Sequence, residues 1–327
     1  MKSRCKHLLY PVLFIFAALA GIIQFCGCGS EFGILLDKPK GPAAIYWAEP
    51  GAGIIRRVYS DSTEPELLIT CSGTPLDIAL DRAGRRVFWT EFSGTSYQIR
   101  KASIDGTGDE LFYEYPSSPN HGPTAITIDP IYGKLFGNRY QNSSGHHDIW
   151  RSDLDTASEE KWCNTLPLSY TFAMCTDPEN RYLYITANTY WDINTIFGSG
   201  NSGAIYRADL DTLNTYSEVL TGTASADPSC AFRDIAVDST GGHVFYVEPS
   251  EGLTIMRAGP DLGGPVEWID PGGGEIRYLA IDPERRKIYW ADAGNNIIYR
   301  ADLDAHNSGI NEFLQLTGAL AGLCVDP

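Results

Sequence analysis

The sequence lacks the short motifs of the common catalytic and metal sites. It contains no Gly-x-Ser-x-Gly elbow, no His-Glu-x-x-His and no phosphate-binding loop. The cysteines that follow residue 28 have no zinc-site spacing; they are Cys71, Cys163, Cys175, Cys230 and Cys324. The sequence therefore predicts no cofactor, no metal ion and no catalytic residue, and it favours a protein that is not an enzyme.

Positive charge is also scarce. The chain has 25 Lys and Arg against 41 Asp and Glu, which gives a formal net charge of −16. An acidic surface repels phosphate backbones and anionic lipid headgroups. We therefore expect no nucleic-acid partner and no direct binding to a lipid surface.

A long apolar run occurs at the N-terminus, where Lys2, Arg4 and Lys6 precede the apolar segment 8–25. This pattern predicts a secretory signal, and Gly27-Cys28 after it resembles a bacterial lipobox with a lipid on the Cys28 thiol. We expect a signal peptide at residues 1–27, a tether at 28–42 and a folded domain at 43–327. That domain would be extracytoplasmic, in the periplasm or at the cell surface, and held to the membrane by the lipid. The alternatives are an ordinary secreted protein and an uncleaved N-terminal membrane helix.

The rest of the chain is a repeat of strand-like segments. A short apolar run ends in aspartate six times. An aromatic strand follows each of the first five runs, and the aromatic strand that belongs with the sixth run begins near residue 45. The aspartates lie about 45 to 60 residues apart and are Asp81, Asp129, Asp177, Asp238, Asp282 and Asp326. An all-β repeat of this length predicts a six-bladed β-propeller with four antiparallel strands in each blade. Because the chain opens on an aromatic strand and stops on an apolar one, the C-terminal strand should complete the first blade.

The aromatic strands carry a family resemblance. Tyr46-Trp47-Ala48-Glu49, Phe88-Trp89-Thr90-Glu91 and Tyr289-Trp290-Ala291-Asp292 resemble the Tyr-Trp-Thr-Asp (YWTD) motif of the low-density-lipoprotein-receptor class B repeats. The likeness weakens in the middle of the chain, where Gly137 stands in the place of the tryptophan. The resemblance implies a six-bladed propeller whose role is protein binding.

The connections between strands predict where binding occurs. Strands alternate in direction, so the connections after the aromatic strands share a face with those that lead into the next unit. The longest connections fall on that face, and the longest of all spans about 186–203. We expect the binding residues to be Tyr190, Trp191, Ile196, Phe197 and Tyr140. The alternative is that Trp191 and Phe197 pack within their own loop.

Other motifs have simpler interpretations. His121, His146 and His147 fall on the same face, but solvated loop histidines are more common than metal ligands. The Asp-Leu-Asp triplets at 153–155, 209–211 and 302–304 recur at one structural position, which favours turn capping over calcium binding. Arginines that recur in the third strand of five units should reach carboxylates of the blades; they are Arg100, Arg151, Arg207, Arg257 and Arg300.

The function predicted from these features is binding of a protein or other macromolecule by a lipid-anchored monomer. One alternative is a hydrolase similar to the six-bladed lactonases and gluconolactonases, which hold a metal in the central channel with carboxylate and Asn side chains. A further alternative is a purely structural envelope protein.

Overall fold

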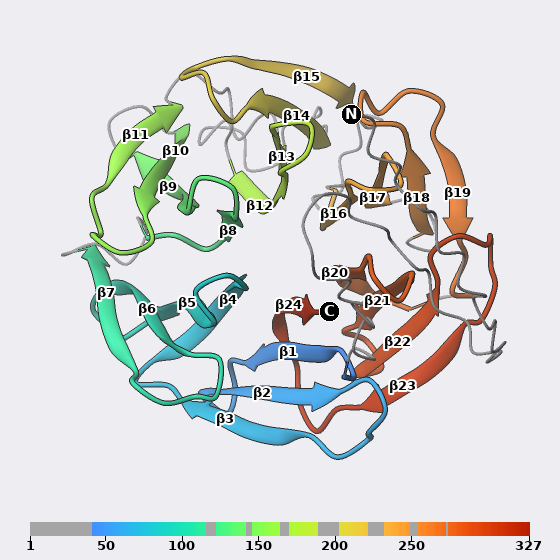
Figure 1. The fold of residues 1–327 in the computed structure, drawn as a ribbon, viewed down its shortest axis with the longest axis horizontal. Helices are drawn as coiled ribbons and strands as arrows, with labels where there is room; N and C mark the ends of the chain where they lie inside the picture. Colours follow the sequence, from blue (N-terminus) through green and yellow to red (C-terminus); the bar gives the residue numbers. More distant parts are fainter. Residues whose placement is uncertain are drawn as a thin grey trace, which may run out of the picture. The chain divides into compact units, whose positions relative to one another are not determined.

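The computed structural model describes residues 41–115, 122–141, 146–163, 170–188, 203–221, 232–248, 254–272 and 274–327. Residues Pro42–Pro327 form one compact unit. The strands of the described residues make six four-stranded antiparallel sheets, which we number blades 1 to 6 in the order of their aromatic strands. Figure 1 shows these sheets arranged in a ring.

The blades have the following strands. Blade 1 contains β24 (Ala321–Asp326), β1 (Ala44–Glu49), β2 (Ile54–Tyr59) and β3 (Glu66–Thr70). Blade 2 contains β4 (Thr74–Asp81), β5 (Arg86–Phe92), β6 (Tyr97–Ser103) and β7 (Glu110–Tyr115). Blade 3 contains β8 (Ile126–Asp129), β9 (Lys134–Gln141), β10 (His146–Asp153) and β11 (Glu160–Cys163).

The second half of the ring repeats this plan. Blade 4 contains β12 (Tyr170–Asp177), β13 (Tyr182–Asn188), β14 (Gly203–Asp209) and β15 (Tyr216–Thr221). Blade 5 contains β16 (Ile235–Asp238), β17 (His243–Glu248), β18 (Thr254–Ala258) and β19 (Val266–Ile269). Blade 6 contains β20 (Ile276–Asp282), β21 (Lys287–Asp292), β22 (Ile297–Asp302) and β23 (Asn311–Gln315).

The ring is closed by the two ends of the domain. Strand β24 pairs antiparallel with β1, so that Ala44 lies opposite Asp326 and Ile45 opposite Val325. The predicted fold class, the number of blades and the closure by the C-terminal strand are therefore confirmed. Closure in this way joins the end of the chain to its beginning without leaving an open sheet edge at the seam.

The core lies between blades. Trp47 of blade 1 packs in one cluster with Tyr289 and Phe313 of blade 6. Phe136 and Trp162 of blade 3 pack with Leu183 of blade 4 in another. Large aromatics on the second strand of a blade give a flat sheet enough apolar area to bury against its neighbour. The sequence pattern of aromatic strands therefore has a direct packing cause.

Equal turns join the first and second strands of blades 2 to 6. They occupy residues 82–85, 130–133, 178–181, 239–242 and 283–286. The closing aspartate of the first strand caps each turn: Asp81 accepts the Gly84 N–H at 2.9 Å, and Asp238 accepts the Gly241 N–H at 3.0 Å. Each closing aspartate thus ends its strand and fixes the turn that follows it.

Candidate functional site

The two faces of the ring differ in the connections that they carry. The face with the equal turns, which we call the turn face, also carries the connections between third and fourth strands. The opposite face, here the loop face, carries the connections between blades and six connections within blades, at 50–53, 93–96, 142–145, 189–202, 249–253 and 293–296. Connection length is thus nearly constant on one face and varies widely on the other.

The predicted binding residues lie in or beside these variable connections. Tyr190, Trp191, Ile196 and Phe197 lie outside the described residues. The strands that carry their segment are described, and Asn188 at the end of β13 lies opposite Gly203 at the start of β14, at the loop face. Tyr140 is in β9 opposite His147 of β10, also near that face, and only its backbone is described.

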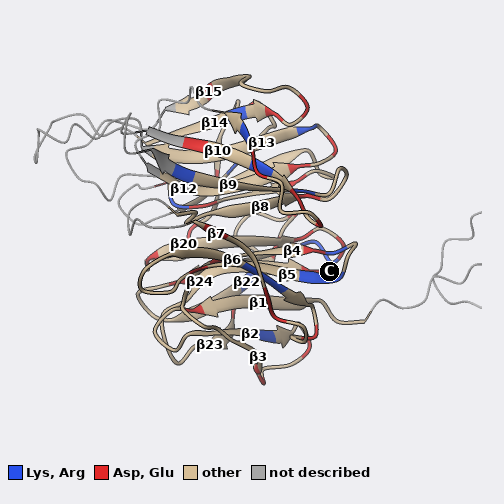
Figure 2. Ribbon diagram, turned by 90° about the vertical axis from the view of Figure 1, so that its left-hand side faces the viewer, with Lys and Arg blue, Asp and Glu red and all other residues tan. Residues whose placement is uncertain are grey.

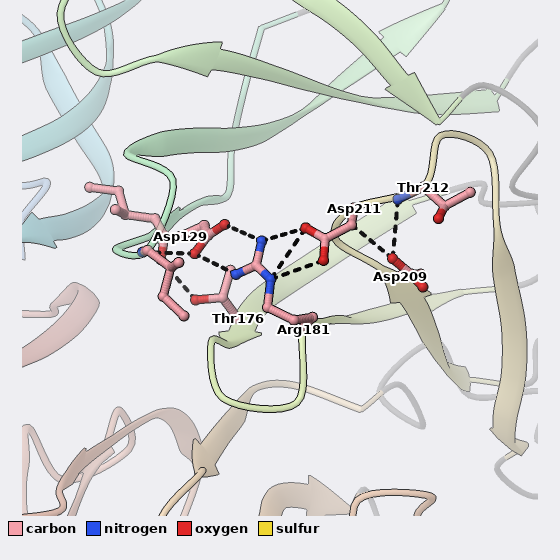
Figure 3. A network of polar contacts seen from close by, with 8 residues as sticks. Asp129, Thr176, Arg181, Asp209, Asp211 and Thr212 are labelled. Atoms are coloured by element: carbon pink, nitrogen blue, oxygen red, sulfur yellow. Dashed lines mark hydrogen bonds and ion pairs between the residues drawn. The ribbon is translucent and has the colours of Figure 1, made fainter.

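The turn face is held together by arginine–aspartate contacts. Figure 3 shows one such network, in which the guanidinium of Arg181 lies between Asp129 and Asp211. Arg181 donates to both oxygens of the buried Asp129, at 2.9 and 2.8 Å, and to Asp211 at 2.7 Å. These hydrogen bonds raise the pKa of Arg181 and lower the pKa of Asp211. Because Asp129 belongs to blade 3 and Arg181 to blade 4, the contact fastens one blade to the next.

These contacts alternate around the ring. The last residue of each turn is in the left-handed conformation, with φ between 53° and 66°. It is arginine in blades 2, 4 and 6 and glycine in blades 3 and 5. In chain order these residues are Arg85, Gly133, Arg181, Gly242 and Arg286. Arg286 holds Asp238 of blade 5 at 2.9 and 2.7 Å. Arg85 approaches Asp326 of blade 1 only to 3.8 Å. Glycine has no side chain that could reach the preceding blade, so this contact recurs only at every second seam, while other contacts, such as Arg86 of blade 2 to Asp155 of blade 3 at 2.6 Å, cross a seam that lacks it.

The Asp-Leu-Asp triplets belong to the same system. Asp209 accepts the backbone N–H groups of Asp211 and Thr212 at 2.8 and 3.1 Å, and Leu210 is buried. Asp304, the last residue of another triplet, binds Arg286. The predicted turn-capping role is therefore seen at Asp209, whereas Asp153 and Asp302 bind Lys134 and Lys287 of the neighbouring strand. Figure 2 shows acidic and basic residues together on the side of the ring that carries the C-terminus, which is the turn face.

The third-strand arginines were predicted to reach carboxylates, and this is correct for only some of them. Arg100 donates to Asp109 at 2.9 Å and Arg151 to Glu160 at 2.9 Å. Arg207 and Arg300 instead donate to backbone carbonyls of the next blade, Pro260 and Ser60, at 2.8 and 3.0 Å. Arg257 lies over the ring of Trp268. The position is shared, but the partner differs, since Arg207 and Arg300 reach the next blade and the other three arginines contact residues of their own blade.

The centre of the ring contains a cavity of about 700 Å³ lined by the innermost strands. Asp77 of β4 and Asp234, just before β16, face it with partly exposed side chains. Asp77 accepts the N–H groups of Ile78 and Ile126, each at 2.8 Å. Asp234 accepts those of Ile235 at 2.8 Å and Leu279 at 2.5 Å. Each carboxylate thereby binds its own strand and the innermost strand of the next blade.

Burial sets the protonation of these two carboxyls. Burial raises the pKa of Asp77 to about 7 and that of Asp234 to about 8, although the backbone hydrogen bonds act in the opposite direction. Tyr278 of blade 6 also faces the cavity, and burial together with the charges of Asp77 and Asp234 raises its pKa to about 12. The cavity wall therefore contains groups that titrate near neutral pH.

Sequence reasoning did not identify these channel carboxyls. Their signal is an aspartate four residues before the closing aspartate, as in Asp77-Ile-Ala-Leu-Asp81 and Asp234-Ile-Ala-Val-Asp238. The other repeats have alanine, tyrosine or glycine there, at Ala125, Ala173, Tyr278 and Gly322. Cys175 and Cys324 are partly exposed free thiols on the same cavity wall.

The described part of the chain contains neither a cluster of metal ligands nor a membrane-spanning helix. Its residues include no group of three or more His, Cys, Asp and Glu side chains arranged to hold a metal ion. His146 and His147 are in β10 with side chains outside the description, and His121 is outside it altogether. None of the described segments forms a helix able to cross a bilayer.

Comparison with known proteins supports the architecture. No protein-family model matches the sequence. A chain in the crystal structure of the nidogen/laminin complex superposes with a TM-score of 0.65 at 17% identity, over 86% of this chain and 98% of that one. TolB from Acinetobacter baumannii superposes with a TM-score of 0.65 at 13% identity, over 88% of this chain and 67% of TolB.

A more distant match is an enzyme. The GH74 enzyme of Niastella koreensis has a TM-score of 0.52 at 12% identity, and the match covers 83% of this chain and 45% of the enzyme. At these identities the likeness shows the fold alone. The chain is a six-bladed β-propeller.

Proposed function

We propose that this chain is a lipid-anchored, extracytoplasmic propeller that binds a protein or another macromolecule through its loop face. The proposal includes a relationship to the YWTD repeats, which rests on the aromatic strands at 46–49, 88–91 and 289–292. The lipid on Cys28 would hold a monomeric domain at the membrane surface, in the periplasm or outside the cell.

The observation that carries this proposal is the difference between the two faces. On the turn face the connections have nearly constant lengths, and several of their charged side chains bind one another, as Arg181 binds Asp129 and Asp211. On the loop face the connections vary, and the segment 189–202 is the longest within a blade. A rigid scaffold with variable connections on one face is the usual arrangement of a binding protein.

The composition of the longest segment favours a macromolecular partner. Tyr190, Trp191, Ile196 and Phe197 concentrate apolar and aromatic side chains in a chain that is acidic overall. Aromatic residues dominate the energetic centres of protein interfaces because they bury a large area with few rotatable bonds. The similarity to a chain in a nidogen/laminin complex is consistent with this role.

A capture experiment tests the proposal. The domain from residue 31 onward is immobilised and exposed to an extract of the host envelope, and the captured polypeptide is identified, purified and titrated against the domain. We expect the double variant Trp191→Ala/Phe197→Ala to weaken binding at least 100-fold while its melting temperature stays within about 2 °C.

The turn face supplies a matched control. Ile131 and Tyr132 are 53% and 60% exposed in the turn that joins β8 to β9. The variant Ile131→Ala/Tyr132→Ala removes a similar apolar area from the opposite face, so it should bind normally. A loop-face variant that melts lower and still binds its partner would show that Trp191 and Phe197 are structural, and would contradict the proposal.

The channel supports a second candidate, a hydrolase that works at the centre of the ring. Asp77 and Asp234 face the cavity as inward carboxylates would in such an enzyme. Both oxygens of each already accept backbone N–H groups, which favours a structural role for them. A stoichiometric divalent ion in the purified protein, together with lactone hydrolysis that the variant Asp77→Asn abolishes, would favour the enzyme instead.

A further inference from the structure

Asp77 and Asp234 occupy the same repeat position in blades on opposite sides of the ring. The innermost strands follow one another in the order β24, β4, β8, β12, β16 and β20, with β20 next to β24. Blade 2, which carries Asp77, is therefore three blades away from blade 5, which carries Asp234. Both side chains face the central cavity.

Each of the two carboxyls joins a pair of blades. One oxygen of Asp77 accepts the Ile126 N–H of blade 3, and one oxygen of Asp234 accepts the Leu279 N–H of blade 6. The other oxygen in each case accepts the N–H of the following residue. Both oxygens must be acceptors for this pattern. A proton on either oxygen uses one of its lone pairs and makes that oxygen a poorer acceptor, so one of the two bonds is weakened.

The charged groups nearby do not neutralise these carboxyls. Arg82 donates to the Val325 carbonyl at 2.7 Å, and Arg277 binds Glu275 at 2.5 Å. Arg233 and Glu179 complete the charged groups of the cavity wall, and Tyr278, Cys175 and Cys324 are its other titratable groups. Within the described chain no ion pair reaches Asp77 or Asp234, whereas buried Asp238 is held by Arg286 at 2.7 Å.

We propose that Asp77 and Asp234 are proton-operated clamps that couple the bonding between blades to the charge of the central channel. With both groups protonated, neither aspartate adds charge to the channel wall, and the bonds from blade 2 to blade 3 and from blade 5 to blade 6 are weakened. With both ionised, both bonds between blades are at full strength, and the wall gains two negative charges that no ion pair holds within the described chain. This inference does not depend on the proposed partner of the loop face.

The switch lies near neutral pH because both carboxyls resist ionisation in the folded protein. Their pKa values of about 7 and about 8 lie above that of an unfolded aspartate, about 3.9. The stabilisation from these groups is therefore complete below about pH 4 and is lost as pH rises through 7 to 8. Between those limits the unfolding equilibrium constant should rise up to tenfold per pH unit for each group.

Infrared spectroscopy of the wild-type protein tests protonation directly. We expect the carbonyl stretch of protonated carboxylic acid to persist at pH 6, where ordinary aspartates are ionised, and to disappear by about pH 9. The double variant Asp77→Asn/Asp234→Asn should lack this band. A wild-type protein that shows no protonated carboxyl band at pH 6 would overturn the inference, even if neither variant can be purified.

Urea unfolding at pH 5 and pH 8 gives the second measurement. In wild type the unfolding constant should be larger at pH 8 than at pH 5. We expect the ratio of the pH 8 constant to the pH 5 constant to be at least tenfold smaller in either single variant, Asp77→Asn or Asp234→Asn. Asp105→Asn is the control, because Asp105 is exposed and hydrogen bonds from Thr107 lower its pKa to about 2, outside the tested range. Ratios within twofold of wild type in both channel variants would overturn the inference.

Discussion

The indole of Trp150 lies directly over Gly137. The two residues are opposite one another in β10 and β9, and a Cβ atom on Gly137 would lie 2.2 Å from Cζ2 of the indole. In blade 6 the same register has Trp290 on the second strand and Tyr299 on the third, stacked with their ring centres 5.5 Å apart. In blade 3 the tryptophan is therefore on the third strand and not on the second, and it fills the same interior space.

This exchange predicts strong coupling between the two positions. Gly137→Trp alone should destabilise the protein by about 3 kcal/mol or more, because the added ring meets Trp150. Trp150→Tyr alone should cost about 1–3 kcal/mol because it leaves a gap. In the double variant the two changes restore the arrangement of blade 6, so its loss should be smaller than the sum by at least about 1 kcal/mol. If the losses of unfolding free energy, measured with urea, were additive, the two positions would not share one interior space and the interpretation would be wrong.

The contacts between paired blades predict unequal roles for two equivalent arginines. Arg286 holds the buried Asp238 through two bonds, whereas Arg85 is 69% exposed and lies 3.8 Å from Asp326. Arg286→Gln leaves a buried carboxylate without its cation and should cost about 2–4 kcal/mol of unfolding free energy. Arg85→Gln should cost less than about 1 kcal/mol. If chemical denaturation gave equal losses of unfolding free energy for the two variants, the contact of Arg286 with Asp238 would contribute no more to stability than the longer contact of Arg85 with Asp326.

Two tryptophans of the aromatic motif should also differ. The Trp89 indole donates to Glu91 at 2.9 Å, and both residues are fully buried. The Trp290 indole has no hydrogen-bond partner within the described structure, because Asp292 caps the turn at Gly294 instead. Trp89→Phe should therefore cost about 1–3 kcal/mol more than Trp290→Phe. Denaturation midpoints of the two variants check this, and a larger loss for Trp290→Phe would refute it.

The proposed anchor is tested by labelling. We expect a protein expressed with its own N-terminus to incorporate radiolabelled palmitate and to sediment with membranes, and Cys28→Ser to do neither. Cys71→Ser serves as the control, since Cys71 is a free cysteine after the tether and should leave the label unchanged. Label on a Cys28→Ser protein would exclude Cys28 as the lipid site.

The repeat made most of the fold predictable. Each blade must bury two flat faces, so aromatic second strands and aspartate-capped turns recur where the geometry recurs. Closure by β24 followed from the strand type at each end of the chain. The exchange of Gly137 and Trp150 was not predictable from the motif, because it depends on which residues face each other across two strands.

The site was less predictable than the scaffold. Asp77 and Asp234 look like ordinary strand residues in the sequence, and their roles depend on the N–H groups of Ile126 and Leu279, which are far along the chain. The acceptors of Arg207 and Arg300 are likewise backbone atoms of the next blade. The predicted residues of the loop face depend on side chains outside the described structure and stay a prediction.

Photo-crosslinking tests the proposed binding face most directly. A photoreactive amino acid is placed at residue 191 on the loop face or at residue 132 on the turn face, and each protein is irradiated with the captured partner. We predict a covalent adduct from residue 191 and none from residue 132. Adducts from residue 132 alone would place the partner on the turn face and contradict the account.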